Sequence, residues 1–203
     1  MFLQTIEGFA FALDAKDPYT HGHSLRVTQY CELIAQAMGM DERKVDELRH
    51  AATLHDIGKI GLKLESLNKP GRLTREEEDV FRTHPRMGCK ILRPIQIFES
   101  LIPIIYHHHE RHDGSGYPEG KAGDEIPQSA RILAVADAYD AMTSNRSYRQ
   151  AMTEEEAVQE LLRNAGSQFD PRVVEVFVRI IRQKEPSFQT SGSAVAITET
   201  QPF

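Results

Sequence analysis

The sequence has few cysteines, no basic excess and no long apolar run, and each absence removes a class of protein. Its two cysteines, Cys31 and Cys89, form no C-x-x-C pair, which fits a reducing cytoplasm and excludes a disulfide scaffold. Lysine and arginine number 24 against 30 acidic residues, so binding to DNA is not expected. The chain has no run of eighteen apolar residues, so we expect no membrane insertion.

Hydrophobic periodicity predicts helices almost throughout, with no internal repeat and no strand pattern longer than a few residues. The 203 residues are 40% hydrophobic and 27% charged, which is typical of one globular domain. We expect an all-α domain over 1–183 and a flexible tail over 184–203. Helices are predicted over about 2–14, 24–38, 41–57, 74–92, from Pro103 onward, and over 129–143, 153–165 and 171–183.

The histidines are unevenly distributed: all nine lie between positions 21 and 112. Helical spacing places several of them, with one aspartate, on the apolar faces of four predicted helices; these are His55, His84, His108, His109 and Asp137. His84, for example, shares its expected buried stripe with Val80. One such histidine is usually a core residue bonded to a carbonyl, but a set of buried imidazoles and carboxylates indicates a metal centre inside a helical bundle.

The remaining histidines divide into two kinds. His23 opens a predicted helix, from where its side chain could reach the centre. The other four have no strong inward phase and are expected at the surface or behind the ligands; these are His21, His50, His107 and His112. Imidazole with carboxylate suits Fe, Mn, Ni or Zn, and neither cysteine has a spacing that joins the set.

Two motifs and their order along the chain resemble a known family. HDIGK at 55–59 and HHHERHDGSGYP at 107–118 are similar to the HD-GYP subgroup of the HD phosphohydrolase superfamily. THPRMGCKIL at 83–92 and the IPQSARILAVADAYDAMTSNRSYR segment at 126–149 extend the resemblance from about Thr5 to Phe177. The resemblance implies an all-α helical bundle of the HD-domain type with two extra C-terminal helices.

The resemblance also implies a bacterial cytoplasmic phosphodiesterase that hydrolyses cyclic di-GMP to pGpG, and in some members on to GMP. The implied metal ligands are His23, His55, Asp56, His84, His108, His109 and Asp137, with Asp56 bridging two divalent ions. Iron is the favoured metal of the family, and manganese or nickel serves some members. Members that hold three ions carry a glutamate where this chain has Tyr19, so we expect two.

The resemblance suggests a mechanism in which a hydroxide held between two ions attacks phosphorus in line, with Asp56 and Lys59 as catalytic residues. The loop after the histidine pair is rich in glycine and proline, which permits close backbone approach to a ligand. Arginine forks match phosphate oxygens. The predicted substrate-binding residues are Lys59, Arg111, Gly116, Tyr117, Pro118, Arg146 and Arg149.

Three rival activities stay open at this point. The chain could be a cyclic di-GMP receptor with low turnover, a hydrolase that prefers pGpG, or an HD hydrolase of mononucleotides. A full set of metal ligands favours catalysis, while the Tyr117 loop and the Arg146–Arg149 pair argue against mononucleotides. An upstream sensory or receiver domain, or a separate signalling protein, is the expected partner; the sequence leaves the oligomeric state open.

Overall fold

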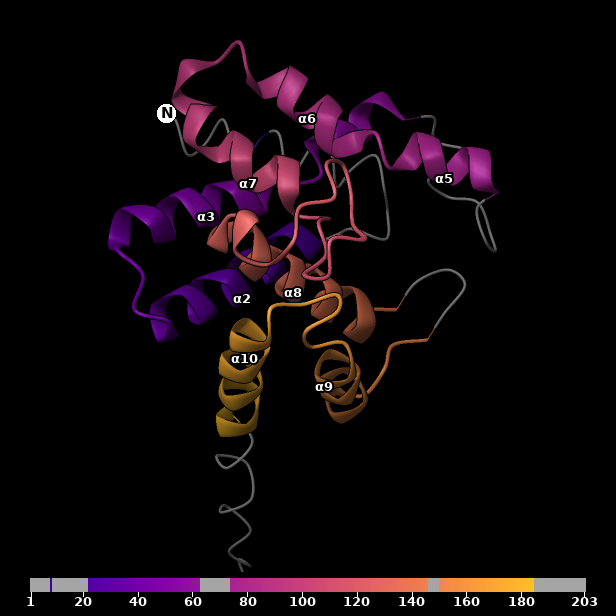
Figure 1. Ribbon diagram of the computed structural model, residues 1–203. Helices are drawn as coiled ribbons and strands as arrows, with labels where there is room; N and C mark the ends of the chain where they lie inside the picture. Colours follow the sequence, from indigo (N-terminus) through magenta and orange to yellow (C-terminus); the bar gives the residue numbers. More distant parts are fainter. Residues whose placement is uncertain (1–7, 9–21, 63–73, 146–149, 185–203) are drawn as a thin grey trace, which may run out of the picture.

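The computed structural model describes residues 8, 22–62, 74–145 and 150–184. Within these ranges the chain is helical, and its only β pairings are two isolated bridges, Asp113–Ala122 and Ala165–Phe169 (Figure 1). The predicted all-α class is confirmed. No helix in the described ranges is long and apolar enough to cross a membrane. The predicted helix 2–14 and the predicted tail lie outside the described residues, apart from Gly8 and Lys184.

The helices begin and end largely where the sequence predicts. Thr74 and Thr153 form the capping boxes that open two of them, each with the glutamate three residues later. The elements are α2 (His23–Ala37), α3 (Glu42–Leu54), η1 (Ile57–Gly61), α5 (Arg75–Phe81), α6 (His84–Leu92), η2 (Gln96–Leu101), α7 (Ile102–His107), η3 (Gly123–Glu125), α8 (Gln128–Thr143), α9 (Glu154–Arg163) and α10 (Pro171–Lys184).

The core lies where α2, α3, α7 and α8 meet. Helix α2 packs on α3 and α8, and α7 packs on the same two helices. Figure 1 shows α5 and α6 at one end of this bundle and α9 and α10 at the other. Phe177 of α10 joins the core through edge-on contacts with Tyr30 and Tyr139, at ring-centroid distances of 5.5 and 4.9 Å. The two C-terminal helices therefore extend the same core, as predicted.

Two helix predictions need correction. The single helix expected over 74–92 is two helices, because Pro85 lies in the first turn of α6. In a continuous helix the Pro85 ring would clash with the Phe81 carbonyl, and proline has no N–H to donate to that carbonyl. The carbonyl of Phe81 accepts a hydrogen bond from His84 Nδ1 instead, at 2.8 Å. Val80, which we expected beside His84 on a buried stripe, is 53% exposed. Helix α3 ends at Leu54, so His55 is its C-cap rather than an interior residue.

Candidate metal centre

Side chains from five parts of the fold converge on one buried point. The side chains form three groups, and within each group the possible ligand atoms all lie within 4.8 Å of one another. The groups are His84, His108 and His109; His23, His55 and Asp137; and His55, Asp56 and His108. These groups contain all seven residues predicted as metal ligands. They come from the start of α2, the α3–η1 junction, the start of α6, the end of α7 and the middle of α8.

Asp56 lies between the other ligands and faces both sides. Its Oδ1 is 3.5 Å from His84 Nε2, and its Oδ2 is 3.4 Å from His55 Nε2. Burial favours the neutral acid, but Lys59 and the neighbouring histidines outweigh it and hold the pKa of Asp56 well below its usual value. A charged carboxylate with one oxygen toward each of two histidine groups has the shape of a bridging ligand.

The backbone orients three of the histidines. His55, His84 and His108 each donate from Nδ1 to the carbonyl three residues earlier, at 2.7, 2.8 and 2.7 Å. This bond fixes the tautomer and leaves the Nε2 lone pair facing the centre. The Nε2 atoms of His55 and His108 are buried without a hydrogen-bond partner among the described residues. Buried polar atoms rarely stay unpaired, and a divalent ion would satisfy both.

His84 and His109 are spaced for one shared ion. Their Nε2 atoms lie 3.1 Å apart, while two nitrogens bound at right angles to one ion, each at about 2.1 Å, lie roughly 3.0 Å apart. Burial lowers the pKa of His84 to about 4 and that of His109 to about 3, so both imidazoles are neutral at pH 7. Neutral imidazole is the form that binds a metal.

Side chains, rather than backbone, orient His23. Its Nδ1 lies 2.7 Å from Asp140 Oδ2, and its Nε2 lies 3.3 Å from Asp137 Oδ1. Asp140 in turn accepts from Arg26 Nε at 2.6 Å and Nη2 at 3.0 Å. Burial opposes protonation of His23, but the hydrogen bonds with the two aspartates outweigh it and raise its pKa to about 9. Sequence reasoning missed Asp140, although it follows Asp137 by three residues on α8 and so shares its face.

The predicted substrate loop folds back on the histidine pair. The Tyr117 ring stacks on His109 with centroids 4.9 Å apart, and Arg82 Cζ lies 5.2 Å from the Tyr117 centroid. The Pro118 carbonyl accepts from Arg86 Nη2 at 3.3 Å. Gly116 lies against backbone, because a Cβ there would approach Arg111 N to 2.3 Å. The loop therefore covers the His84–His108–His109 group.

The predicted cationic residues lie in different surroundings. Lys59 Nζ is 2.5 Å from Asp56 Oδ2 and 5.3 Å from the Phe81 ring centroid, at the edge of the centre. Arg111 donates to Ser115 at 2.8 Å and to Asp113 at 3.3 Å, within its own loop. Arg146, Arg149 and Tyr19 lie outside the described residues. The structure thus places Lys59 beside the ligands and gives Arg111 partners in the loop.

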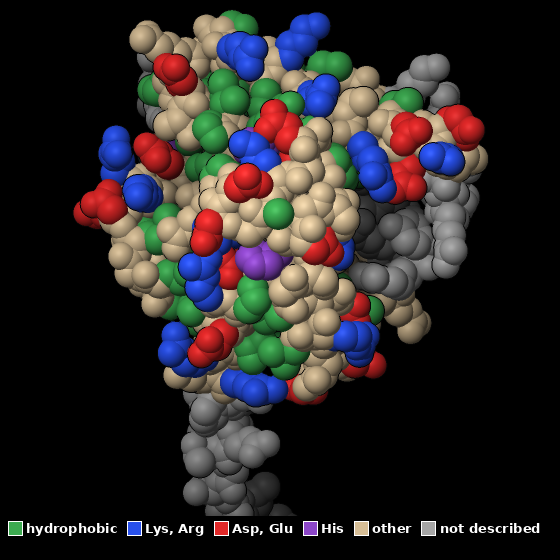
Figure 2. All heavy atoms as spheres, in the orientation of Figure 1, with side chains coloured by type: hydrophobic (Ala, Val, Ile, Leu, Met, Phe, Trp, Pro, Cys, Tyr) green, Lys and Arg blue, Asp and Glu red, His purple; other side chains and the backbone are tan. Residues whose placement is uncertain are grey.

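The histidines predicted as bystanders contribute no ligand to the three groups. His50, His107 and His112 are absent from them, and His21 lies outside the described residues. His107 is nevertheless buried, with Nδ1 3.5 Å from Glu110 Oε1. In the space-filling view only a small histidine patch is visible, with acidic and basic side chains on both sides (Figure 2).

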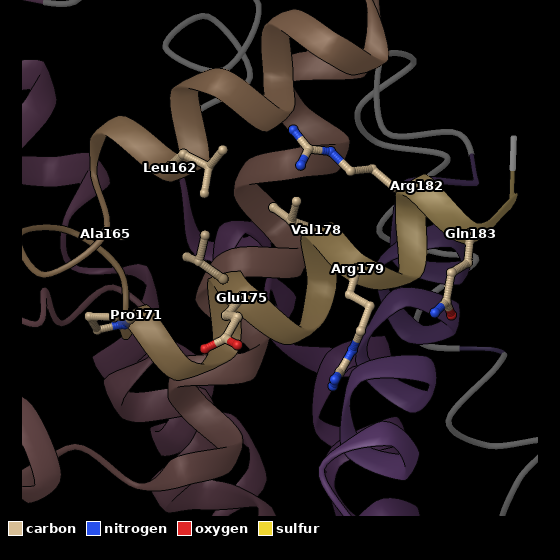
Figure 3. A pocket seen from close by; sticks show the side chains of 9 residues that line it. Leu162, Ala165, Pro171, Glu175, Val178, Arg179, Arg182 and Gln183 are labelled. Atoms are coloured by element: carbon tan, nitrogen blue, oxygen red, sulfur yellow. The ribbon is translucent and has the colours of Figure 1, made fainter.

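A hollow of about 500 Å³ lies between α9 and α10, away from the histidines (Figure 3). Its lining is mostly apolar and also includes Glu175, Arg179 and Arg182. None of its lining residues is histidine or a predicted metal ligand. It is therefore separate from the candidate metal centre.

Comparison with known proteins identifies the family. A model of the HD domain matches residues 9–173. The chain belongs to the HD-domain family. A cyclic di-GMP phosphodiesterase of Thermotoga maritima is 44% identical over 170 residues, which are 83% of this chain and 46% of that protein.

Two further matches extend the comparison. The cyclic di-GMP phosphodiesterase response regulator RpfG of Xanthomonas campestris is 40% identical over 87% of this chain and 47% of its own length. This HD-domain chain thus spans about half the length of these two relatives. A solved structure of a cyclic GMP-AMP specific phosphodiesterase of Vibrio cholerae has a TM-score of 0.70 and 22% identity, over 90% of this chain and 48% of that one. At that identity the likeness establishes the HD-domain fold.

Proposed function

We propose that this HD domain is a metal-dependent phosphodiesterase of the HD-GYP type that hydrolyses cyclic di-GMP to pGpG. The observation that carries the proposal is the position of Asp56, with one oxygen 3.5 Å from His84 Nε2 and the other 3.4 Å from His55 Nε2. A carboxylate so placed suits two ions held side by side, the arrangement that many phosphodiester hydrolases use. The names of the two relatives supply the substrate.

The protein's own residues would hold the site ready for an in-line displacement. Divalent ions, when bound, would lower the pKa of a water molecule and offset charge on the phosphate. Asp56, Asp137 and the histidines would hold the ions, and the backbone bonds of His55, His84 and His108 keep their Nε2 atoms aimed at the centre. Lys59 Nζ, beside Asp56, lies where it can balance negative charge on a phosphate oxygen.

The proposed cofactor is two divalent ions, with iron as the first choice and manganese or nickel as the next. Five imidazoles and two carboxylates form the donor set, and neither cysteine belongs to it. Imidazole with carboxylate suits these metals, while soft sites would need thiolate. Family members that hold three ions carry a glutamate at the sequence position of Tyr19, so we propose two ions rather than three.

The proposed substrate contacts come from the loop over the centre and from basic residues that the family resemblance implies. They are Lys59, Arg111, Gly116, Tyr117, Pro118, Arg146 and Arg149. A second candidate substrate is 3′3′-cyclic GMP-AMP, favoured by a relative of Vibrio cholerae that is 40% identical over 82% of this chain and is named a 3′3′-cGAMP-specific phosphodiesterase. A turnover assay distinguishes these reactions from low-turnover binding of cyclic di-GMP and from a preference for pGpG.

We further propose that the domain spans 1–183 and acts in the cytoplasm. A sensory or receiver domain, in the same chain or on a partner, would supply the input. The match of this chain to about half of each of two relatives is consistent with such an arrangement.

Anaerobic turnover tests the proposal. Protein loaded with Fe(II) or Mn(II) should convert cyclic di-GMP to pGpG, with the product measured by chromatography. It should also contain about two ions per chain. The His55→Ala plus Asp56→Ala variant should lose both metal and turnover. Cyclic GMP-AMP and pGpG, assayed in parallel, rank the candidate substrates. Tight binding of cyclic di-GMP without any product from the loaded protein would instead identify a receptor.

A further inference from the structure

Glu110 is a buried carboxylate that the proposed reaction does not use. Its side chain is 0% exposed and directly follows the His108–His109 pair. Its Oε1 accepts from the Glu119 amide at 2.8 Å, and its Oε2 accepts from the Gly120 amide at 3.0 Å. Among the described residues no lysine or arginine pairs with it. Its other polar neighbour is His107, whose Nδ1 lies 3.5 Å from Oε1. Burying a carboxylate is costly, and the two amide bonds, one to each oxygen, compensate for that cost by fixing the backbone of residues 119 and 120.

What Glu110 holds is the loop over the metal ligands. Glu119 and Gly120 lie two and three residues after Tyr117, whose ring stacks on His109. The Tyr117 amide donates to the His109 carbonyl at 3.2 Å. Gly116 lies so close that a Cβ there would approach Glu110 Cα to 2.6 Å. Glu110 is thus the side chain that ties the far end of this loop to the turn carrying two predicted ligands.

We propose that Glu110 is a positioning residue that sets how the 113–122 loop meets the dinucleotide. Glu110 would fix the distance of Tyr117 and Pro118 from His108 and His109. Because this distance determines how the loop contacts the substrate, Glu110 would affect the affinity for substrate and not the affinity for metal. This inference rests on the proposed phosphodiesterase function. Its carboxylate oxygens accept from loop amides and belong to none of the three ligand groups, so its replacement should leave the metal centre assembled.

The Glu110→Gln variant tests this with the least change of shape. A carboxylate gives each amide its own oxygen, whereas a carboxamide offers one oxygen and sets its NH₂ group against the other amide donor. One bond is lost and a donor faces a donor, so the loop should shift. We expect the KM for cyclic di-GMP to rise about tenfold, with kcat within about twofold of wild type and metal content unchanged.

A small substrate separates loop positioning from damage to the centre. Bis(p-nitrophenyl) phosphate can reach the ions without the loop, so its turnover by Glu110→Gln should match wild type. Hydrogen exchange of the amides at 119 and 120 should accelerate in the variant, which reports the freed loop independently of activity. Gly116→Ala, which pushes the loop off Glu110, should raise the KM for cyclic di-GMP in the same way.

Glu125→Gln is the matched control. Glu125 Oε2 accepts from the Ala122 amide at 3.2 Å, at the end of the same loop, but its side chain is exposed and contacts no predicted ligand. The same chemical change there should leave KM, kcat and metal content at wild-type values. A general sensitivity of the loop to losing a carboxylate would appear in both variants.

Three results would overturn the role of Glu110. They are an unchanged KM for cyclic di-GMP, an equal loss of activity on both substrates, and loss of metal from a folded Glu110→Gln variant. If wild type binds cyclic di-GMP without hydrolysing it, the phosphodiesterase proposal fails and Kd replaces KM in the same comparison. A wild-type protein that neither binds nor hydrolyses any cyclic dinucleotide would overturn both proposals.

Discussion

Replacing Asp140 with asparagine should weaken one half of the metal centre and spare the other. Asp140 is fully buried and accepts from His23 Nδ1 on one side and from Arg26 on the other. Asparagine keeps the shape but has one acceptor and one donor. If its NH₂ faces His23, the ring proton moves to Nε2, the atom that should bind metal. If its oxygen faces His23, the NH₂ meets the Arg26 guanidinium, donor against donor.

The expected size follows from the role of such a carboxylate. Losing the partner that orients a metal-binding histidine costs about 10–100-fold in metal affinity, which is about 1.4–2.7 kcal/mol. Only the His23–His55–Asp137 group should feel the full effect. His84 and His108 are oriented by the carbonyls of Phe81 and Ile105, which the substitution leaves in place.

Isothermal titration calorimetry of Mn(II) into protein stripped of metal by a chelator measures the affinity for each ion directly. Wild type should take up two ions, while Asp140→Asn should bind one normally and the second 10–100-fold more weakly. Asp170→Asn is the control, since Asp170 is also buried and bonded to an arginine, Arg131, at 2.6 Å, but belongs to none of the ligand groups. Equal weakening of both ions by Asp140→Asn, or of neither, would refute the reasoning.

Four further predictions concern the stability of the fold. Gly58→Ala should destabilise the fold by about 1–3 kcal/mol or more, because a Cβ there would lie 1.9 Å from the His84 carbonyl oxygen; a denaturation midpoint equal to wild type would contradict this. Thr153→Ala should cost about 1 kcal/mol through its lost cap in urea unfolding, with Mn(II) uptake unchanged, since α9 contributes no predicted ligand. In metal-free protein, burial lowers the pKa of His84 from 6.5 to about 4, so the unfolded chain binds more protons below pH 6.5 and the melting temperature should fall from there toward pH 4. His23, with its pKa raised from 6.5 to about 9, stabilises fully below pH 6.5 and loses this contribution as pH rises through 9; calorimetry with chelator present would show the reverse trends if these assignments were wrong.

Much of the fold and the ligand set could be predicted because it depends on local pattern. Helix periodicity located α2, α8 and α10 within one or two residues, and the helices predicted to open at Thr74 and Thr153 do so, each with a capping box. Periodicity placed five of the seven predicted ligands on inward helix faces, and the family resemblance supplied His23 and Asp56; the structure brings all seven together. The break at Pro85 could also have been predicted from the sequence, because a proline inside a continuous 74–92 helix would remove one backbone hydrogen bond and clash with the preceding turn.

The residues that periodicity missed are those whose partners lie far along the chain. Asp140 meets His23 across 117 positions, and nothing within either helix alone indicates that contact. Glu110 is buried against amides of a loop, where no periodic pattern exists to predict an inward side chain. Pairings of this kind depend on how helices pack, which a single sequence does not encode in local spacing.

The two halves of the candidate centre are therefore built differently. His84 and His108 take their orientation from main-chain carbonyls, which no side-chain substitution removes. His23 takes its orientation from Asp140, and Asp140 from Arg26, so that half depends on a chain of side chains joining α2 to α8. Any force that slides α2 along α8 would disturb His23 before it reached the His84–His108–His109 group. Since His84 and His108 keep the orientation set by their own carbonyls, an ion held by that group should survive the loss of the ion on the His23 side.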